Sequence, residues 1–408
     1  MPTPTTLTPL HRLPLNPGET EGPFQTFFVP KFEIKVSGKQ LQPEVIHDVL
    51  QVTYRDNLTD VDSFEFTVSN YESGRAELST PLRSRYEPPS REEFRGIFDP
   101  GETIELKMGY VNDLRLMLKG TITTLEPSFN QSGGLSLTVR GLNELHKFRS
   151  VQHTDSWQGK KDSDIAKEIG DKPLSKKAPG LGFTVRVNEE ARWKEQPDSF
   201  VFMNNQYDIV FLMERARRRD YVVVLNESDE KGNPYIYFGP SNDRATPTTY
   251  ELEWGKTLVS FRPTLTTARQ VAKVTVVGWD RRRNQPIKGS ASWSDLLPKQ
   301  NTTERRFQES LLKAFGNREE IISDQPVRDN DEAKSRAKSI LRNMKKDMVE
   351  ATGETVGLPD LRAGRKVQIS SLGDRFSGLY YVTQTTHTIN DSGYRTTFEA
   401  RREEDVEG

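Results

Sequence analysis

The chain contains no cysteine, so it can form neither a disulfide bond nor a thiolate metal site. It also has no excess of charge of one sign, because 58 Lys and Arg residues nearly balance 59 Asp and Glu residues. A near-zero net charge gives no electrostatic reason to expect general affinity for nucleic acid. No apolar run approaches the ~20 residues that a helix needs to cross a bilayer, so we expect no membrane span.

Apolar residues are scarce as well. They make up 33% of the 408 residues, against 29% charged residues, which indicates large polar surfaces and thin cores. The aromatic and β-branched residues nevertheless fall in periodic segments, which makes disorder a poor interpretation. A chain of this length holds about two to four domains.

The N-terminal segment is rich in Pro and Thr and lacks a charged stretch followed by an apolar one. It is therefore not a secretory signal, and we expect the chain to be made in the cytoplasm. Residues 1–26 are predicted to form an extended arm that could grip a neighbouring protein.

Residues 27–150 are predicted to form a first β domain. In one strand the alternating pattern places Phe64, Phe66 and Val68 on the same face. A long loop, residues 71–99, interrupts the strands and is rich in Arg, Glu, Ser and Pro. Loops of this length inside a domain are usually functional.

Residues 151–245 are predicted to form a small α/β domain between two β domains. Gln206–Asp220 is the clearest helix, because its apolar residues recur at helical spacing, and Tyr221–Leu225 follows it as a strand. The helix ends in the basic run Arg215–Arg219. We interpret this run as a solvated last turn whose charge suits the helix dipole, rather than as a nucleic-acid patch.

Residues 246–402 are predicted to form a second β domain, with an insert at residues 294–348 that carries a helix from Asp331 to about Met348. Strands are expected at Val271–Trp279 and Lys288–Trp293. Several more short strands joined by tight turns follow in Leu358–Arg401, a pattern typical of a small barrel or sandwich. Residues 403–408 form a short acidic tail.

No metal, cofactor or catalytic site is predicted. None of the five histidines is spaced from another as helical zinc ligands are, and His387 within a strand is interpreted as a hydrogen-bonded structural histidine. Gly255-Lys256-Thr257 matches the end of a P-loop, but Tyr250 stands where that motif needs its first glycine. We therefore interpret the segment as a plain turn.

Carboxylate pairs are available for glycosidase-like chemistry at Asp60 and Asp62 and at Glu319 and Glu320. A lysozyme, however, needs its own helical module and one carboxyl group in an apolar pocket. No segment supplies such a module, so we do not expect an enzyme.

Four segments resemble, in the same order, parts of the phage late control gene D family, which are tail-hub proteins related to the VgrG spike proteins. They match the strands that close the family's first barrel, the start of its second domain, a helix-then-strand module and the closing strands. The segments are PGETIELKMGYVNDLRLMLKGTITTLEPSF (100–129), SVQHTDSWQGKKDSDIAKEIG (150–170), NNQYDIVFLMERARRRDYVVVL (204–225) and Leu358–Arg401. VgrG proteins continue into an OB-fold and a β-helical needle, so this chain resembles the hub portion alone.

The resemblance implies a mainly β fold, with two similar small tube-type β-barrels, an α/β domain and an inserted helix. It also implies a homotrimer, in which six similar β domains form a pseudo-sixfold ring around a channel. The expected partners are inner-tube subunits, a separate trimeric spike protein and baseplate wedge proteins. The chain would then belong to the baseplate of a contractile phage tail or injection system.

The partner interface is expected at the long loop and at a basic hairpin tip. Strands Thr103–Val111 and Val271–Trp279 are expected to have edges that a neighbouring subunit covers. Two alternatives stay open, a tail-tip enzyme that degrades cell wall, with its active site in residues 151–245, and a free carbohydrate-binding module. The predicted interface residues are Arg83, Arg85, Tyr86, Arg91, Phe94, Arg281, Arg282 and Arg283.

Overall fold

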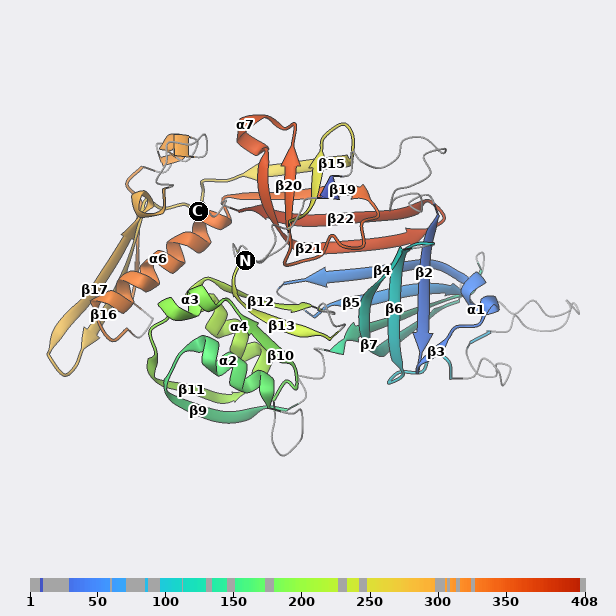
Figure 1. Cartoon of the computed structure of the whole chain (residues 1–408), viewed down its shortest axis with the longest axis horizontal. Helices are drawn as coiled ribbons and strands as arrows, with labels where there is room; N and C mark the ends of the chain where they lie inside the picture. Colours follow the sequence, from blue (N-terminus) through green and yellow to red (C-terminus); the bar gives the residue numbers. More distant parts are fainter. Residues whose placement is uncertain are drawn as a thin grey trace, which may run out of the picture.

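Two strongly curved β sheets, joined edge to edge, dominate the structure, which is a computed structural model of the chain (Figure 1). An α/β unit and a projecting arm, in which a long helix packs on a small sheet, complete it. The fold is mainly β with an α+β insert, as the sequence predicted. The structure describes residues 8–9, 29–58, 61–70, 85–86, 96–111, 113–129, 134–144, 151–172, 180–226, 233–241, 248–297, 305–306, 309–312, 316–323 and 327–403.

The first β domain is an antiparallel sheet with the strand order β4-β5-β8-β7-β6-β2-β3. The alternation in β5 is confirmed, because Phe64, Phe66 and Val68 are buried and their neighbours are not. Phe66 and Tyr86 both pack on Phe98 inside this sheet. The elements are β2 (Pro30–Val36), β3 (Lys39–Gln40), α1 (Pro43–His47), β4 (Val49–Asn57), β5 (Ser63–Ser69), β6 (Thr103–Tyr110), β7 (Asp113–Ser128) and β8 (Ser136–Asn143).

The α/β unit has a core of its own, built around two helices, a three-stranded sheet and a two-stranded ribbon. The predicted helix and following strand are confirmed as α4 and β12. The helix ends at Arg219 and is followed by the capping residue Asp220, which adopts the left-handed conformation with φ 62°. The elements are β9 (His153–Lys160), α2 (Asp162–Asp171), β10 (Thr184–Val187), α3 (Glu189–Lys194), β11 (Asp198–Gln206), α4 (Asp208–Arg219), β12 (Tyr221–Asn226) and β13 (Tyr235–Pro240).

The prediction that the basic end of α4 is solvated is wrong for Arg215. This side chain is buried and pairs with Asp162 at 2.5 Å and with Asp198. Arg219 on the next turn also pairs with Asp162. Two arginines one helical turn apart thus share one buried carboxylate, an arrangement that the local sequence pattern does not reveal.

The second β domain has the strand order β15-β19-β22-β21-β20-β14-β1, in which β14 is parallel to both of its neighbours. A single bridge between Trp254 and Leu258 connects β14 to the start of β15, at the opposite edge of the sheet. The elements are β1 (Thr8–Pro9), β14 (Thr248–Glu253), β15 (Leu258–Leu265), β19 (Val349–Val356), β20 (Lys366–Ser370), α7 (Gly373–Phe376), β21 (Gly378–Asn390) and β22 (Gly393–Arg402).

The projecting arm is where the sequence-based assignment fails. Strands β16 and β17 were expected in the second β domain but form a separate sheet with β18, and α6 packs on one face of it. A side chain at Gly289 would lie 2.1 Å from the backbone nitrogen of Lys334, so glycine is what allows α6 to approach. The elements are β16 (Lys273–Asp280), β17 (Gln285–Ser292), η4 (Trp293–Leu296), β18 (Glu319–Ile322) and α6 (Asn330–Lys346).

The two strands that were expected to have uncovered edges are both internal. Strand β16 lies between β17 and β18, and β6 lies between β2 and β7. The expectation that a neighbouring subunit covers these edges is therefore wrong for β6 and for Lys273–Val276 of β16, because strands of the same chain pair with them on both sides. Strand β18 does not pair with Val277–Asp280, so the expectation stays a prediction for that half of β16.

The N-terminus of α6 is capped by an aspartate side chain, and substitution of this residue tests the contribution of the cap. The Asp329 side chain accepts a hydrogen bond from the backbone nitrogen of Glu332 at 2.8 Å, which caps the helix. Replacing Asp329 with alanine is expected to lower the free energy of unfolding by about 1 kcal/mol, measured by urea denaturation. The control Asp331→Ala removes a carboxylate from the same turn and should cost about 0.3 kcal/mol. Equal losses would contradict the capping role.

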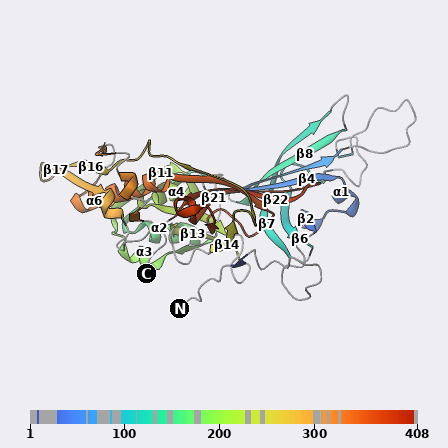
Figure 2. The same cartoon turned by 90° about the horizontal axis from the view of Figure 1, so that it is seen from above.

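Strands β21 and β22 form the link between the two β domains. Residues Gln384–Asn390 of β21 pair with Asn57–Gln51 of β4, so one continuous sheet runs through both domains. Figure 2 shows the long β21–β22 hairpin crossing from one domain to the other. At its end, Ile389 and Tyr394 pack into the core of the first domain. The two domains are therefore joined by backbone pairing and by hairpin side chains that enter the core of the first domain.

Candidate functional site

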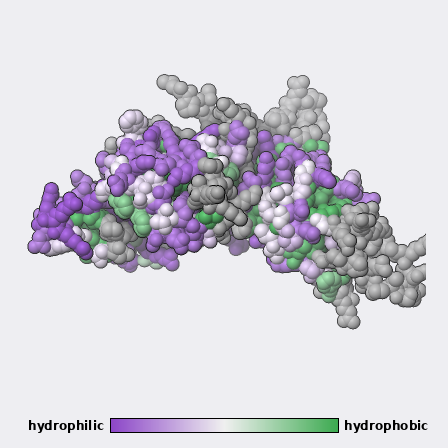
Figure 3. Space-filling view, turned by 90° about the horizontal axis from the view of Figure 1, so that it is seen from below, coloured by the Kyte–Doolittle hydropathy of each residue, from purple (hydrophilic) through white to green (hydrophobic). Residues whose placement is uncertain are grey.

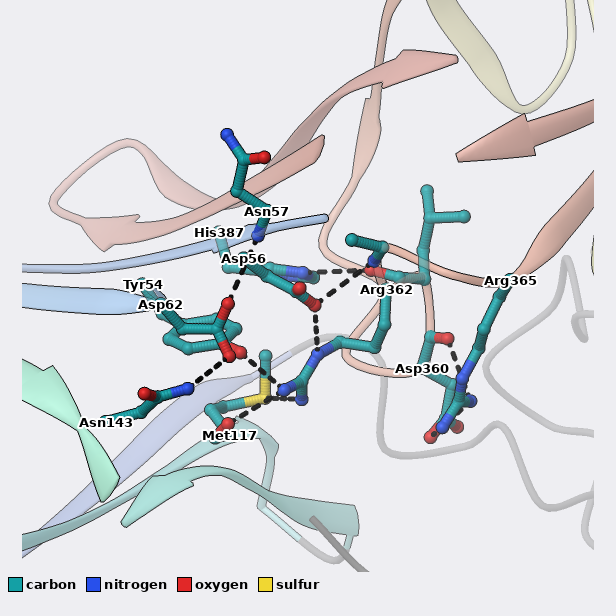
Figure 4. Close-up of polar contacts among 12 residues, drawn as sticks. Tyr54, Asp56, Asn57, Asp62, Met117, Asn143, Asp360, Arg362, Arg365 and His387 are labelled. Atoms are coloured by element: carbon teal, nitrogen blue, oxygen red, sulfur yellow. Dashed lines mark hydrogen bonds and ion pairs between the residues drawn. The ribbon is translucent and has the colours of Figure 1, made fainter. Parts of the chain in front are cut away.

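A network of hydrogen bonds and an ion pair lies at the junction between the two β domains (Figure 4). The loop between β19 and β20 carries Arg362 across this junction to strands β4 and β7. Its Nε donates to Asp56 at 2.8 Å, and Nη2 donates to the Tyr54 hydroxyl at 2.6 Å and to the Met117 carbonyl at 2.8 Å. The backbone nitrogen of Ala363 adds a second hydrogen bond to Asp56, at 3.1 Å.

The groups around Arg362 at the junction stabilise its positive charge. Burial disfavours the charged guanidinium, but the neighbouring Tyr54 oxygen and the Asp56 carboxylate outweigh that effect, so the pKa of Arg362 lies above its usual range. The guanidinium carbon also lies 4.6 Å from the centre of the Tyr54 ring, a cation–π contact. Arg362 therefore joins the domains by a charge-assisted, multiply bonded contact.

A second carboxylate, Asp62, fixes the turn between β4 and β5 beside this contact. It accepts hydrogen bonds from the backbone nitrogen of Asn57 at 3.2 Å and from the Asn143 side chain at 2.7 Å. In the sequence, Asp62 and Asp60 form a carboxylate pair of the kind that glycosidases use. The hydrogen bonds of Asp62 instead tie strands β4 and β8 together at the junction.

His387 is hydrogen bonded and fully buried, as its place in a strand predicted. Its Nε2 lies 3.0 Å from the Leu361 carbonyl, and Nδ1 lies 3.0 Å from the Tyr394 hydroxyl. Burial, with a smaller contribution from the charge of Arg362, lowers the pKa of His387 to about 3. The ring is therefore neutral at pH 7, with Nε2–H donating to the carbonyl and Nδ1 accepting from the hydroxyl.

This network is suited to holding two domains at a fixed angle. Its charged groups are engaged with one another and with backbone carbonyls, and its histidine is far from the pKa that general acid–base catalysis at neutral pH needs. In the part of the chain that the structure describes, no group of three or more His, Asp or Glu side chains is placed to hold a metal ion. No helix in that part is long and apolar enough to span a membrane.

Two of the predicted interface residues lie against the first β domain itself. Tyr86 is 7% exposed, and its hydroxyl donates to Asp48 at 2.5 Å. Arg85 pairs with the same carboxylate at 2.8 Å and with Glu44 at 3.2 Å. Contact between Tyr86 and a partner stays a prediction, although most of its surface is already used within the chain. Arg83, Arg91 and Phe94 lie outside the described residues, as do most of the N-terminal arm and the 71–99 loop.

The other predicted interface residues, Arg281, Arg282 and Arg283, form the exposed turn between β16 and β17. Asp280 shapes this turn by accepting hydrogen bonds from the backbone nitrogens of Arg282 and Arg283, at 2.9 and 3.1 Å. The structure does not bring this turn near Arg85 and Tyr86. Figure 3 shows hydrophilic residues gathered at the end of the molecule that carries the arm.

Sequence reasoning missed Arg362. It lies in the segment that resembles the closing strands of a hub, but 306 residues separate it from its partner Asp56. The nearest signal was the run Leu358–Arg365, in which Pro359-Asp360 and Gly364 mark turns that hold an arginine between two strands.

Most of the chain matches the model of a known protein family. A family model described as the Alg8 N-terminal domain matches residues 29–391, which include the first β domain, the α/β unit, the arm and the second β domain except for β1 and β22. The chain belongs to this family. The Alg8 N-terminal domain family is not the late control gene D family that the sequence resembles, so that resemblance stays a prediction. No curated protein matches the chain.

Solved structures share the fold over nearly the full length. A 43 kDa tail protein of prophage MuSo2 from Shewanella oneidensis has a TM-score of 0.63 at 14% identity, covering 91% of this chain and 98% of that one. A tail protein from Neisseria meningitidis has a TM-score of 0.61 at 13% identity, covering 92% and 97%. The E. coli c3393 protein, a type VI secretion component similar to the bacteriophage T4 tail proteins gp27 and gp5, has a TM-score of 0.53 at 12% identity, covering 92% and 78%. The chain thus has a fold found in phage tail and type VI secretion proteins.

Proposed function

We propose that the chain is a structural baseplate hub of a contractile phage tail or injection system. Three copies would form a pseudo-sixfold ring that joins the inner tube to the spike. The observation that carries this proposal is the shared fold, which extends over 98% of a phage tail protein without a large unmatched domain. The resemblance of four ordered segments to the late control gene D family supports the same role.

The two β domains fit such a ring because, within the described residues, each presents a curved sheet of six strands with a two-residue strand added at one edge. Three chains would then offer six similar surfaces to a sixfold tube, provided that the two domains of each chain keep a constant angle. The pairing of β21 with β4 and the contacts of Arg362 supply that rigidity. A closed threefold ring further needs complementary faces on the two domains.

The proposed partners are a second and third copy of the chain, inner-tube subunits, a trimeric spike and baseplate wedge proteins. The exposed basic turn of Arg281, Arg282 and Arg283 is a candidate contact for one of them, because it projects from the body and is not engaged in the sheet. We propose no enzymatic role, since the titratable groups at the junction hold the domains together.

The oligomeric state tests the proposal directly. In analytical ultracentrifugation, the purified chain should sediment at three times its own mass, and electron microscopy should show a ring with an axial channel. The full chain should also be recovered between tube and spike in purified particles. A stable monomer that clears peptidoglycan would favour the enzyme, and a monomer that retains sugar would favour the binding module. Either result would overturn the hub.

A further inference from the structure

The two-stranded ribbon of β9 and β11 carries two exposed phenylalanines that the proposed hub function does not use. Phe200 and Phe202 are 56% and 53% exposed. Their ring centroids lie 6.2 Å apart, and the ring planes are 15° from parallel. Figure 1 shows the ribbon at the outer margin of the α/β unit, away from both β domains. The two rings therefore form one aromatic patch that faces solvent in the described structure.

In the described ribbon, the face that carries these rings has no charged side chain. Side chains alternate along a strand, and Trp157, Val201 and Met203 are buried, so their neighbours along each strand point outward. The outward-facing residues are Thr154, Ser156, Gln158, Phe200, Phe202 and Asn204. This face differs from the chain as a whole, in which 29% of the residues are charged. A lack of charge combined with aromatic residues is typical of the centre of a protein interface.

Strand β11 also has an open edge. Within the described residues it pairs with β9 alone, and Ser199–Asn204 form no backbone hydrogen bond with any other segment. In an antiparallel pair, every second residue points its N–H and C=O groups away from the partner strand. Charged residues or proline usually protect such an edge, and Ser199–Asn204 contain neither. The edge can therefore accept a further strand.

The backbone just before β11 is engaged, in contrast to the strand itself. Nη2 of Arg219 donates to the carbonyl of Gln196 at 3.2 Å, and Nη1 of Arg328 donates to the carbonyl of Pro197 at 3.1 Å. The unpaired backbone therefore begins with the strand, beside the aromatic patch.

The inner face of the ribbon is fixed in the core of the α/β unit. Trp157, Val201 and Met203 all belong to that core. The Trp157 ring stacks on Phe211 of α4, with 5.4 Å between the ring centroids. Because the ribbon is already ordered, a strand that adds to it would lose little entropy on the side of this chain.

We propose that β11 accepts an added β-strand from a partner protein. The partner segment is extended and uncharged, with apolar residues at alternating positions that pack on Phe200 and Phe202. Backbone hydrogen bonds along Ser199–Asn204 supply affinity, and the two rings select the side chains. A charged segment fits poorly, because the outward face offers no opposite charge to compensate for its loss of water.

The partner is assigned to a different protein rather than to a second copy, and this assignment rests on the proposed hub function. Two copies that pair β11 with β11 in antiparallel fashion form a twofold dimer. A hub ring closes with threefold symmetry, which such a contact does not provide.

The test selects binders to the full chain from a displayed library of random nonapeptides. The wild-type chain should enrich uncharged peptides in which apolar and polar residues alternate. Biolayer interferometry then gives the dissociation constant of the most enriched peptide. The variant Phe200→Ser/Phe202→Ser should weaken its binding about tenfold or more, because the apolar contact is lost. N-methylation of the peptide backbone should weaken binding at every second residue only, because only those N–H groups face β11.

A matched control removes exposed aromatic side chains outside the ribbon. Trp254 and Trp279 are exposed to a similar degree, so Trp254→Ser/Trp279→Ser should change the affinity by less than about twofold. A second variant keeps the proposal testable if the phenylalanine variant fails to fold, which circular dichroism and urea unfolding reveal. Gln158→Glu adds one charge opposite Phe200 and should weaken binding about fivefold. An unchanged affinity in this variant would overturn the proposal.

Other outcomes would also overturn strand addition. These are enrichment of charged peptides, equal losses in the two double variants, or N-methylation effects that do not alternate. A dimer of the wild-type chain that Phe200→Ser/Phe202→Ser abolishes would assign the edge to a second copy. Binding of chitohexaose that the same variant abolishes would make the face a sugar-binding surface. Peptide affinity is measured separately from trimer formation, so the strand site and the hub function can fail independently.

Discussion

Replacing Arg362 with alanine is expected to lower the free energy of unfolding by about 3–5 kcal/mol, measured by urea denaturation. The substitution leaves Asp56 buried at the domain junction without its ion pair and removes the donor to the Met117 carbonyl. Removing one partner of a buried charge pair costs more than the pair itself contributes, because the remaining charge stays out of water. The same variant should lower the yield of the proposed ring.

A matched control separates this effect from the general loss of an arginine. Arg395 in β22 pairs with Glu354 on the surface, and its side chain is 54% exposed. Arg395→Ala should therefore cost about 0–1 kcal/mol. Arg362→Lys keeps the charge but loses the forked geometry, and should fall between the two. If Arg362→Ala cost no more than Arg395→Ala, the junction would not depend on this side chain.

The second large effect is a dependence of stability on pH that arises at His387. Its pKa is about 3 in the folded chain and about 6.5 when unfolded, so the unfolded state binds the proton more readily. The stability contributed by the neutral ring is fully present above pH 6.5 and is lost as the pH falls toward 3. The loss is about 1.4 kcal/mol for each pH unit in that window, or about 3 kcal/mol at pH 4.5.

Comparison with His387→Gln isolates this contribution from that of the carboxylates. Glutamine keeps one donor and one acceptor but does not titrate, so the variant should be less stable at pH 7.5 and should lose less stability on acidification. The measurement is the free energy of unfolding in urea at several pH values for both chains. Parallel curves between pH 6.5 and 4 would contradict the assignment.

Local pattern was a sound guide wherever one face of an element is buried. The alternation of Phe64, Phe66 and Val68 predicted β5, and the helical spacing in Gln206–Asp220 predicted α4. These assignments held because burial of one face imposes a period of two residues on a strand and of 3.6 on a helix. The fold class followed from the order of such segments.

Local pattern was a poor guide to which strands share a sheet. Strand β16 is rich in β-branched residues and was expected in the second β domain, but it pairs with β17 and β18 and packs against α6. The absence of a side chain at Gly289 permits the close approach of α6 to this sheet. A glycine in a strand signals some close contact, but it does not say with which part of the chain.

The candidate sites illustrate the same limit for charged residues. The run Arg215–Arg219 was interpreted as a solvated last turn of the helix, yet Arg215 is buried on Asp162 while Arg218 lines the cleft between α4 and α6. The environment of each arginine depends on the residues that face it from neighbouring elements. Those elements are α2 and α6, whose residues lie far from α4 in the sequence.

By itself, the sequence determined that this protein is mainly β with an α/β insert, that it has no cysteine chemistry, and where most helices and strands lie. These properties depend on amino-acid composition and on apolar residues that recur every two to four positions. Tertiary structure alone decided that β21 joins β4, that Arg362 reaches Asp56, and that residues of α4 and α6 line one cleft. The physical reason is that such contacts depend on residues up to 306 positions apart, and their energies depend on burial that no local pattern encodes.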